Sequence, residues 1–354
     1  MGFSDTSPYG GEIFTLNIAS LAYQSAMFTN FHVAPTCTPT RAMLLTGRDN
    51  HIVGVGNMKE LLADNQFGER GYEGGLNSRA VTIATILRAA GYHRYMAGKW
   101  PLGQTKERLP ASQGFEESVV LGEGGADNWE KKSYTPKYNA VHFYEGFNEI
   151  DLPADFYSSK FYTDRLLGYI DKNANDGKPF FGYLAFQAVH QPPQAPAEFT
   201  KRYVWTYRVG WSAIKQMRYH IMTSEGGTRA PLVIRYPKKV AVGERTDTFA
   251  YVLDVVPTLL DLAGVTPQQV NELATFGGRS MIPLFCRRFK GDSRQQRGVL
   301  RPSLLGIPQC IAATTSWYAI CHRFAISNGT FTISVLTQPR RTIFLQPTLT
   351  WSRP

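Results

Sequence analysis

The sequence lacks the features that mark several classes of protein. It has no run of 18 or more apolar residues, so no transmembrane helix is predicted. Residues 1–5 carry neither the basic start nor the apolar stretch that is typical of a signal peptide. There is no internal repeat or low-complexity tract, and 43% of the 354 residues are hydrophobic, so disorder is not expected. We expect a globular chain with enough apolar material for one large domain or two smaller ones.

Cysteine is also scarce, with four in the whole chain. No two of them have the Cys-x-x-Cys spacing of a metal site, and four are too few for a disulfide scaffold. Cys37 stands alone in the body of the chain, because the other three lie in or beside the last segment. Neither a zinc site nor a disulfide framework is predicted.

Acidic residues are almost missing from the C-terminal segment. Residues 287–354 contain ten basic residues and one acid, whereas residues 1–286 are close to neutral. Almost all of the net charge of +10 therefore belongs to this segment. It does not show the pattern of basic and aromatic residues of a known nucleic-acid module, so we predict no nucleic-acid partner and no membrane partner.

Helix-like and strand-like segments alternate in the body, which predicts an α/β fold with a mostly parallel sheet. Residues 179–186 form a hydrophobic run without alternation, typical of a strand buried on both faces, and residues 231–236 predict another strand. Two helices are predicted from their end signals: one from Thr82 as N-cap to Gly91, and one from Pro257 at its first position to Gly264.

One cysteine lies at a predicted helix start. Thr38 is a suitable N-cap and Pro39 a suitable first helical residue, so a helix is expected to begin here and end before Gly47. Free backbone N–H groups and the helix dipole favour an anion beside Cys37, and Arg41 is close enough to reach back. A nucleophile beside an anion hole suits a sulfate or phosphate ester. From spacing alone, the alternative is a small buried thiol at a helix start.

Residues 37–47 read Cys-Thr-Pro-Thr-Arg-Ala-Met-Leu-Leu-Thr-Gly. They resemble the signature Cys-x-Pro-x-Arg-x-x-x-Leu-Thr-Gly of the sulfatase family, and of its arylsulfatases in particular. Four further segments resemble family blocks in the family's order: residues 31–36, 91–100, 188–196 and 223–231. The resemblance implies an alkaline-phosphatase-like mixed sheet flanked by helices. We expect an incomplete sulfatase catalytic domain over residues 1–285 and a basic tail over 286–354 without a family match.

The resemblance also implies the chemistry. In the family the signature cysteine is converted to formylglycine by a formylglycine-generating enzyme, and the hydrated aldehyde attacks the sulfur of a small-molecule sulfate ester. Carried over to this chain, Cys37 is the nucleophile's precursor, and Arg41 and Lys99 hold sulfate oxygens by charge-assisted hydrogen bonds. His190 follows a predicted buried strand and would protonate the leaving oxygen. The implied activity is sulfuric ester hydrolysis with calcium as the family's metal ion.

The chain departs from the family pattern at the metal site and beside it. The family's paired metal aspartates and its Ser-Asp-Asn-Gly segment have no counterpart, since Asp5 matches neither aspartate and an abnormal junction lies near residues 203–222. Cys37 would be the remaining metal ligand. Pro101 replaces a family histidine, and His220 replaces an active-site lysine as a substrate-binding residue. A hard cation needs several oxygen ligands, so we predict no tight calcium binding and impaired hydrolysis.

Two alternatives stay open at this point. One is a non-catalytic sulfatase remnant, and the other is a phosphomonoester or phosphonate hydrolase of the same superfamily. Asp5, Asp49 and Asp127 are the acids that a recruited calcium site would use. The other body histidines are expected to be structural or surface residues: His32, His51, His93 and His142.

Overall fold

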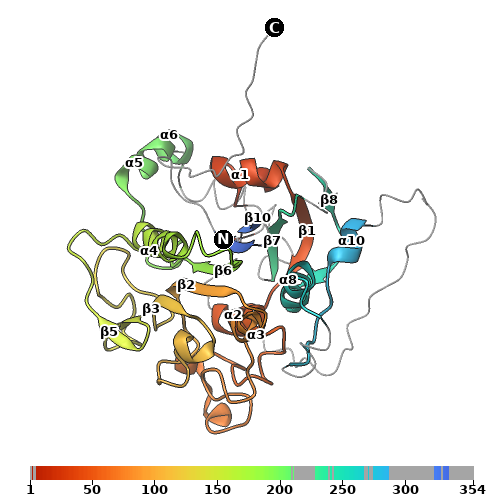
Figure 1. Cartoon of the computed structure of the whole chain (residues 1–354). Helices are drawn as coiled ribbons and strands as arrows, with labels where there is room; N and C mark the ends of the chain where they lie inside the picture. Colours follow the sequence, from red (N-terminus) through yellow and green to blue (C-terminus); the bar gives the residue numbers. More distant parts are fainter. Residues whose placement is uncertain are drawn as a thin grey trace.

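A central mixed sheet of eleven strands organises the molecule (Figure 1). The computed structural model describes residues 2, 5–208, 210, 228–237, 240, 243–266, 270, 274–286, 323–327 and 330–334. The strand order is β5-β4-β3-β2-β6-β11-β10-β7-β1-β8, and β9 pairs with β1. The strands are β1 (Ala26–His32), β2 (His93–Lys99), β3 (Glu117–Leu121), β4 (Phe143–Glu145), β5 (Asn148–Ile150), β6 (Phe180–Ala185), β7 (Arg229–Ile234), β8 (Arg245–Thr246), β9 (Ala250–Tyr251), β10 (Arg323–Ser327) and β11 (Thr330–Ser334).

Helices lie on both faces of this sheet (Figure 1). The α-helices are α1 (Leu16–Tyr23), α2 (Cys37–Thr46), α3 (Ile83–Ala89), α4 (Ser158–Lys172), α5 (Ala197–Thr200), α6 (Val204–Tyr207), α8 (Val255–Leu262) and α10 (Ile282–Cys286). Short 3-10 helices connect them, among them η2 (Lys59–Leu61), η4 (Pro110–Gln113) and η6 (Val252–Asp254). Within the described ranges, no helix is both long and apolar enough to span a bilayer.

Side-chain alternation along β2 divides the core into two parts. Met96 points into a cluster with residues of α2, α3 and α8, whereas its neighbours Tyr95 and Ala97 point into a cluster with residues of α4. Strand geometry sends successive side chains to opposite faces, so a strand covered on both sides must be apolar throughout. This is why the run over residues 179–186 shows no alternation.

The strand directions bring the carboxyl ends of β1, β2, β3, β6 and β11 to one edge. β2 is parallel to β3 and β6, and β6 is parallel to β11. β11 is antiparallel to β10, β10 is parallel to β7, and β7 is antiparallel to β1. β1 therefore runs in the same direction as β2 and β6. Ligands of open α/β sheets collect at such carboxyl ends.

Most of the predicted elements are confirmed. Thr82 caps α3 through its side-chain oxygen, which accepts a hydrogen bond from the Thr85 amide at 3.2 Å. Gly91 and Gly264 follow their helices with left-handed φ values of +79° and +71°. The predicted start at Pro257 is wrong by two residues, because α8 begins at Val255 directly from η6. Proline is nevertheless tolerated within the first helical turn, because the N–H groups there have no acceptor inside the helix and the missing N–H breaks no helical hydrogen bond.

His93, one of the histidines expected to be structural or surface residues, forms ion pairs with two carboxylates. Its ring, almost fully buried at the start of β2, contacts Glu116 at 2.9 Å through Nδ1 and Asp176 at 2.5 Å through Nε2. Burial opposes the charged ring, but the two carboxylates outweigh it and raise the pKa of His93 above 6.5. The ring therefore ties the start of β2 to the residue before β3 and to the loop after α4.

We expect His93→Gln to lower the free energy of unfolding by about 1 kcal/mol at pH 6, the scale of a partly exposed charge-assisted contact. Because the folded pKa is raised, the stabilisation is fully present below pH 6.5 and is lost as the pH rises through the folded value. Urea unfolding of both proteins at pH 6 and pH 9 measures this difference. An equal difference at the two pH values would contradict the assigned ion pairs.

Candidate active site

Cys37 is the first residue of α2 and follows the carboxyl end of β1 by five residues. The residue is 7% exposed, and all ten residues of α2 are buried. The N-cap is Thr36, so the prediction of Thr38 as N-cap is wrong by two positions. The Thr38 hydroxyl instead lies 3.8 Å from the Cys37 Sγ. As predicted, the helix ends before Gly47, which adopts a left-handed φ of +62°.

Two cations from different elements surround the thiol. Lys99 is the last residue of β2, and its Nζ lies 3.5 Å from the Cys37 Sγ. One terminal nitrogen of Arg41, one turn into α2, donates to the Lys99 carbonyl at 3.2 Å and to the Tyr183 hydroxyl at 3.1 Å. Lys99 and Arg41 are 2% and 4% exposed, so their charges are held out of water. The structure thus brings together three of the residues that the sequence predicted.

The charges in this cluster shift one another's ionisation. Burial opposes the Cys37 thiolate, but the positive charges of Lys99 and Arg41 outweigh it, and the pKa of Cys37 is lowered. Burial lowers the pKa of Lys99 to about 8, and the Arg41 charge adds to this effect, while Cys37 opposes it. A pair of buried cations close to a single thiol is suited to an anion with several oxygens.

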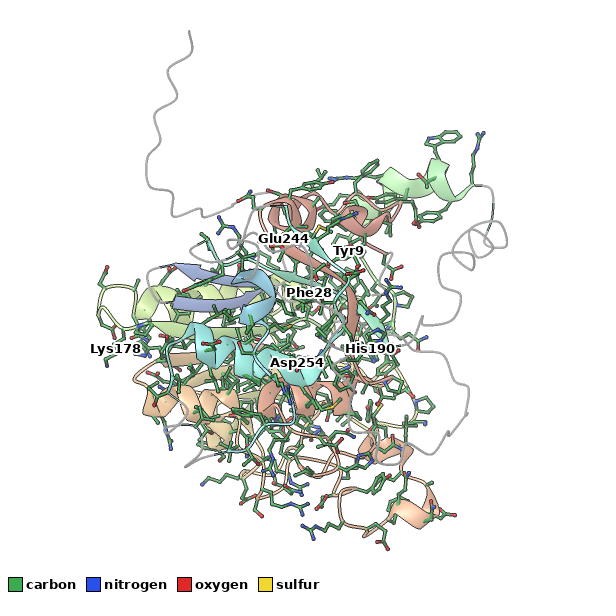
Figure 2. All side chains as sticks on the ribbon, turned by 90° about the vertical axis from the view of Figure 1, so that its right-hand side faces the viewer. Tyr9, Phe28, Lys178, His190, Glu244 and Asp254 are labelled. Atoms are coloured by element: carbon green, nitrogen blue, oxygen red, sulfur yellow. The ribbon has the colours of Figure 1, made fainter. Side chains whose placement is uncertain are left out.

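His190 lies on the loop after β6, at the same edge of the sheet as Lys99 at the end of β2. In Figure 2 it lies on the opposite side of the molecule from Lys178, which precedes β6. Its Nδ1 is 2.7 Å from the Gln191 carbonyl, and its ring packs edge-on against Tyr134 at 5.0 Å between centroids. Burial, followed by the charge of Lys99, lowers the pKa of His190 to about 3. The ring is therefore neutral at ordinary pH and within electrostatic reach of the cluster.

The structure adds Tyr183, which the sequence analysis did not single out. This residue of β6 is completely buried and points to the same face as α2, where its hydroxyl accepts from Arg41. Its position in an apolar strand could have signalled a polar partner, because a buried tyrosine hydroxyl usually finds one. His220, the predicted substrate-binding residue, lies outside the described residues.

A cavity of about 710 Å³ opens at the carboxyl ends of β2 and β3. Pro101, two residues after Lys99, lies in its wall with the loop Gly122–Gly124 that follows β3. The opposite wall comes from η2 and from the segment before β4. The lining side chains of these parts are Lys59, Glu60, Gln104, Arg108, Glu123, Lys137, Tyr138, His142 and Tyr144.

The residues around Cys37 do not fit a calcium site. Its closest charged neighbours are cations, and the described part of the chain contains no group of three His, Cys, Asp or Glu side chains placed to hold a metal ion. Asp49 instead contacts His51, and Asp127 accepts hydrogen bonds from the Trp129 and Glu130 amides. Such a surplus of positive charge favours an anion over a cation.

Comparison with known protein families gives two matches. Residues 1–219 match the family model described as Sulfatase. Residues 217–297 match the model described as N-sulphoglucosamine sulphohydrolase, C-terminal. The first match alone covers more than half of the chain, and it contains Cys37, Arg41, Lys99 and His190.

Individual relatives agree with this assignment. The chain is 40% identical over 230 residues to an uncharacterised sulfatase of Schizosaccharomyces pombe, covering 62% of this chain and 41% of that protein. It is 36% identical over 220 residues to an arylsulfatase of Klebsiella aerogenes, covering 62% of this chain and 47% of that protein. The chain thus spans less than half the length of these two curated relatives.

Solved structures share the fold. A crystal structure of Ps i-CgsB superposes with a TM-score of 0.63 at 25% identity, covering 81% of this chain and 74% of that one. A more distant neighbour at 17% identity, solved with its substrate D-glucosamine-2-N,6-O-disulfate, has a TM-score of 0.54 and covers 80% of this chain and 78% of that one. The predicted alkaline-phosphatase-like α/β fold is confirmed by these superpositions.

Proposed function

The chain belongs to the sulfatase family, and from this premise we propose that it is a sulfuric ester hydrolase whose sulfate-binding centre is Cys37, Arg41, Lys99 and His190, with turnover impaired at the metal site. The observation that carries the proposal is the contact of 3.5 Å between the Lys99 Nζ and the Cys37 Sγ. Both this lysine and the neighbouring Arg41 are buried. The substrate would be a small-molecule sulfate ester, as for the neighbour solved with a disulfated glucosamine.

The proposed roles follow from charge and position. Arg41 and Lys99 bind the sulfate oxygens through charge-assisted hydrogen bonds, and Tyr183 orients the Arg41 guanidinium. Cys37 supplies the position of the attacking group, and its conversion to formylglycine would provide an aldehyde hydrate as the nucleophile. Since these four residues do not include a calcium ligand set, no step is assigned to a metal ion.

His190 has a defined tautomer in this proposal. A carbonyl can only accept, so the Nδ1 next to Gln191 carries the proton and donates it, which leaves Nε2 unprotonated in the neutral ring. A general acid must first gain a proton there. The negative charge of a bound ester would offset Lys99 and Arg41, which are among the causes of the low pKa of His190. Substrate binding and protonation of His190 would thus favour each other.

The hydrolase proposal is tested by producing the chain together with a formylglycine-generating enzyme. We expect mass spectrometry of the Cys37 peptide to show the lighter formylglycine form. We expect turnover of 4-nitrophenyl sulfate to be about 10²–10⁴-fold below that of an intact arylsulfatase, the scale of a lost acid–base group. Turnover should vanish in Cys37→Ala.

Three results would overturn parts of this proposal. An unmodified thiol, in a host whose other sulfatases are converted, would remove formylglycine from it. Turnover within tenfold of an intact arylsulfatase, lost in Cys37→Ala, would show that the metal site is not impaired. Faster hydrolysis of 4-nitrophenyl phosphate than of the sulfate would favour the phosphoester alternative.

The pH dependence of sulfate binding tests the Lys99 role separately. Lys99 loses its charge above its pKa of about 8, so the affinity for inorganic sulfate should fall above pH 8 by up to about tenfold per pH unit. Calorimetric titrations between pH 7 and pH 10 measure this trend. The decline should persist in Cys37→Ala, which excludes the thiolate as its cause, and a constant affinity would contradict the proposed role.

A further inference from the structure

Two neighbouring glycines lie between the large cavity and His190. Gly124 lies in the cavity wall, where an added Cβ would stand 2.4 Å from the Tyr138 hydroxyl. At the next residue, Gly125, an added Cβ would stand 2.8 Å from the Nδ1 of His190. The backbone between them therefore separates His190 from the cavity by one residue.

Glu60 is the second link between the cavity and the cluster. It lies in the cavity wall, accepts a hydrogen bond from Tyr138, and interacts electrostatically with Lys99. Pro101 adds a third link, since it lies in the wall two residues after Lys99. With about 710 Å³, the cavity has the size of a small-molecule site.

Both acids of the cavity are occupied by the protein itself. Glu60 is bonded to Tyr138. Glu123, whose side chain is 5% exposed, accepts hydrogen bonds from Gln104 at 2.9 Å and from the His142 amide at 2.9 Å, and it contacts the His142 ring at 2.7 Å. Each of these carboxylates is therefore already hydrogen-bonded to a side chain of the cavity wall.

The three long cationic side chains of the cavity, in contrast, have no carboxylate partner among the described residues. Lys59, Arg108 and Lys137 line it, and none of them forms an ion pair with a carboxylate among the residues that the structure describes. Arg108 donates only to a backbone oxygen, that of Glu73, at 3.4 Å. A concave site whose acids are satisfied and whose cations are not attracts negative charge.

We propose that this cavity receives the alcohol part of the sulfate ester, and that the preferred alcohol carries a second anionic group, a carboxylate or another sulfate, bound by Lys59, Arg108 and Lys137. This inference rests on the proposed function, because it places the ester's sulfate at Cys37. It defines the substrate class as an ester with at least two negative groups. Pro101 leaves the wall beside Lys99 without a hydrogen-bonding side chain.

The test compares two matched ligands by calorimetry on the whole chain. One is carboxyphenyl sulfate, as its 3- and 4-isomers, and the other is the methyl ester of each, which keeps the shape and removes the second charge. We expect at least one isomer of the free acid to bind about tenfold more tightly than its methyl ester at low salt, and this preference should shrink as salt increases. A triple substitution of Lys59, Arg108 and Lys137 by glutamine should abolish the preference, so that the acid and its methyl ester bind with equal affinity.

A control triple variant removes the same number of charges elsewhere. Lys106, Lys131 and Lys160 lie outside the cavity lining, and glutamine at these positions should leave the preference intact. Equal binding of acid and methyl ester by the unsubstituted chain, or a preference that survives the cavity triple variant, would overturn the inference alone. Binding of neither ligand would overturn the sulfate-binding function from which it starts.

Discussion

Replacing Gly98 by alanine is expected to lower the free energy of unfolding by on the order of 3–5 kcal/mol. Single substitutions cause losses of this size only through a few mechanisms, among them steric overlap in the core and backbone strain. Gly98 has a φ of +119°, and an added Cβ would stand 2.1 Å from the carbonyl oxygen of Ala185. These two residues are partners in the pairing of β2 with β6. Relief would require the two central strands to separate. Lys99 follows directly, so the active-site lysine would be displaced as well.

Gly91→Ala provides the matched control for that experiment. Gly91 also has a left-handed φ, of +79°, but an added Cβ there would meet nothing within 4 Å. Only the backbone conformation resists the substitution, which should cost about 1 kcal/mol. Urea unfolding of the two variants distinguishes the cost of the backbone conformation from the cost of steric overlap. Equal losses in the free energy of unfolding at the two positions would contradict the close approach of β2 and β6.

The second large effect is expected at Lys99, where affinity and stability should change in opposite directions. Lys99→Met removes a buried charge that contacts the position of the sulfate, and inorganic sulfate should bind on the order of 100-fold more weakly. The same change should stabilise the fold below pH 8. The pKa of Lys99 falls from 10.5 to about 8 in the folded chain, which corresponds to about 3 kcal/mol against the charged form.

The sign of this effect can be checked across pH. A lysine whose folded pKa is lowered binds fewer protons in the folded state than in the unfolded state between pH 8 and pH 10.5. Folding of the unsubstituted chain should therefore become more favourable as the pH rises through this range, whereas Lys99→Met should show a smaller rise. Lys172→Met, at an exposed lysine paired with Glu117, is the control for both measurements. Loss of stability in Lys99→Met at pH 7 would contradict this account.

The parts of the site that are local in sequence could be predicted. Cys37 and Arg41 lie in one short motif, and the apolar run over residues 179–186 predicted the strand β6, which ends at Ala185 and leads to His190. Lys99 was identified by the resemblance of residues 91–100 to a family block, and the structure places it at the end of β2. The roles of these residues stay predictions, but the structure gathers them at one edge of the sheet.

The remaining parts depend on contacts that no local pattern encodes. Tyr183 reaches Arg41 because β6 lies beside β2 with one particular register, and register is set by packing over the whole sheet. The cavity walls come from η2, from the segment after β2 and from the long connection between β3 and β4, which no local pattern brings together. His142, expected to be a structural or surface residue, is half-buried and contacts the buried carboxylate of Glu123, a partner that the sequence did not indicate. Irregular segments carry too little periodicity for such pairings to be predicted.

The burial of α2 fixes an order of events in time. Cys37 is 7% exposed, and Pro39 and Arg41, which complete the local motif, are buried with it. If Cys37 is converted to formylglycine as proposed, an enzyme that must enclose this segment would have to act before the helix docks between the sheet and its neighbours. Conversion and folding would then compete in the newly made chain. A folded molecule would keep whichever side chain it had when the helix was buried.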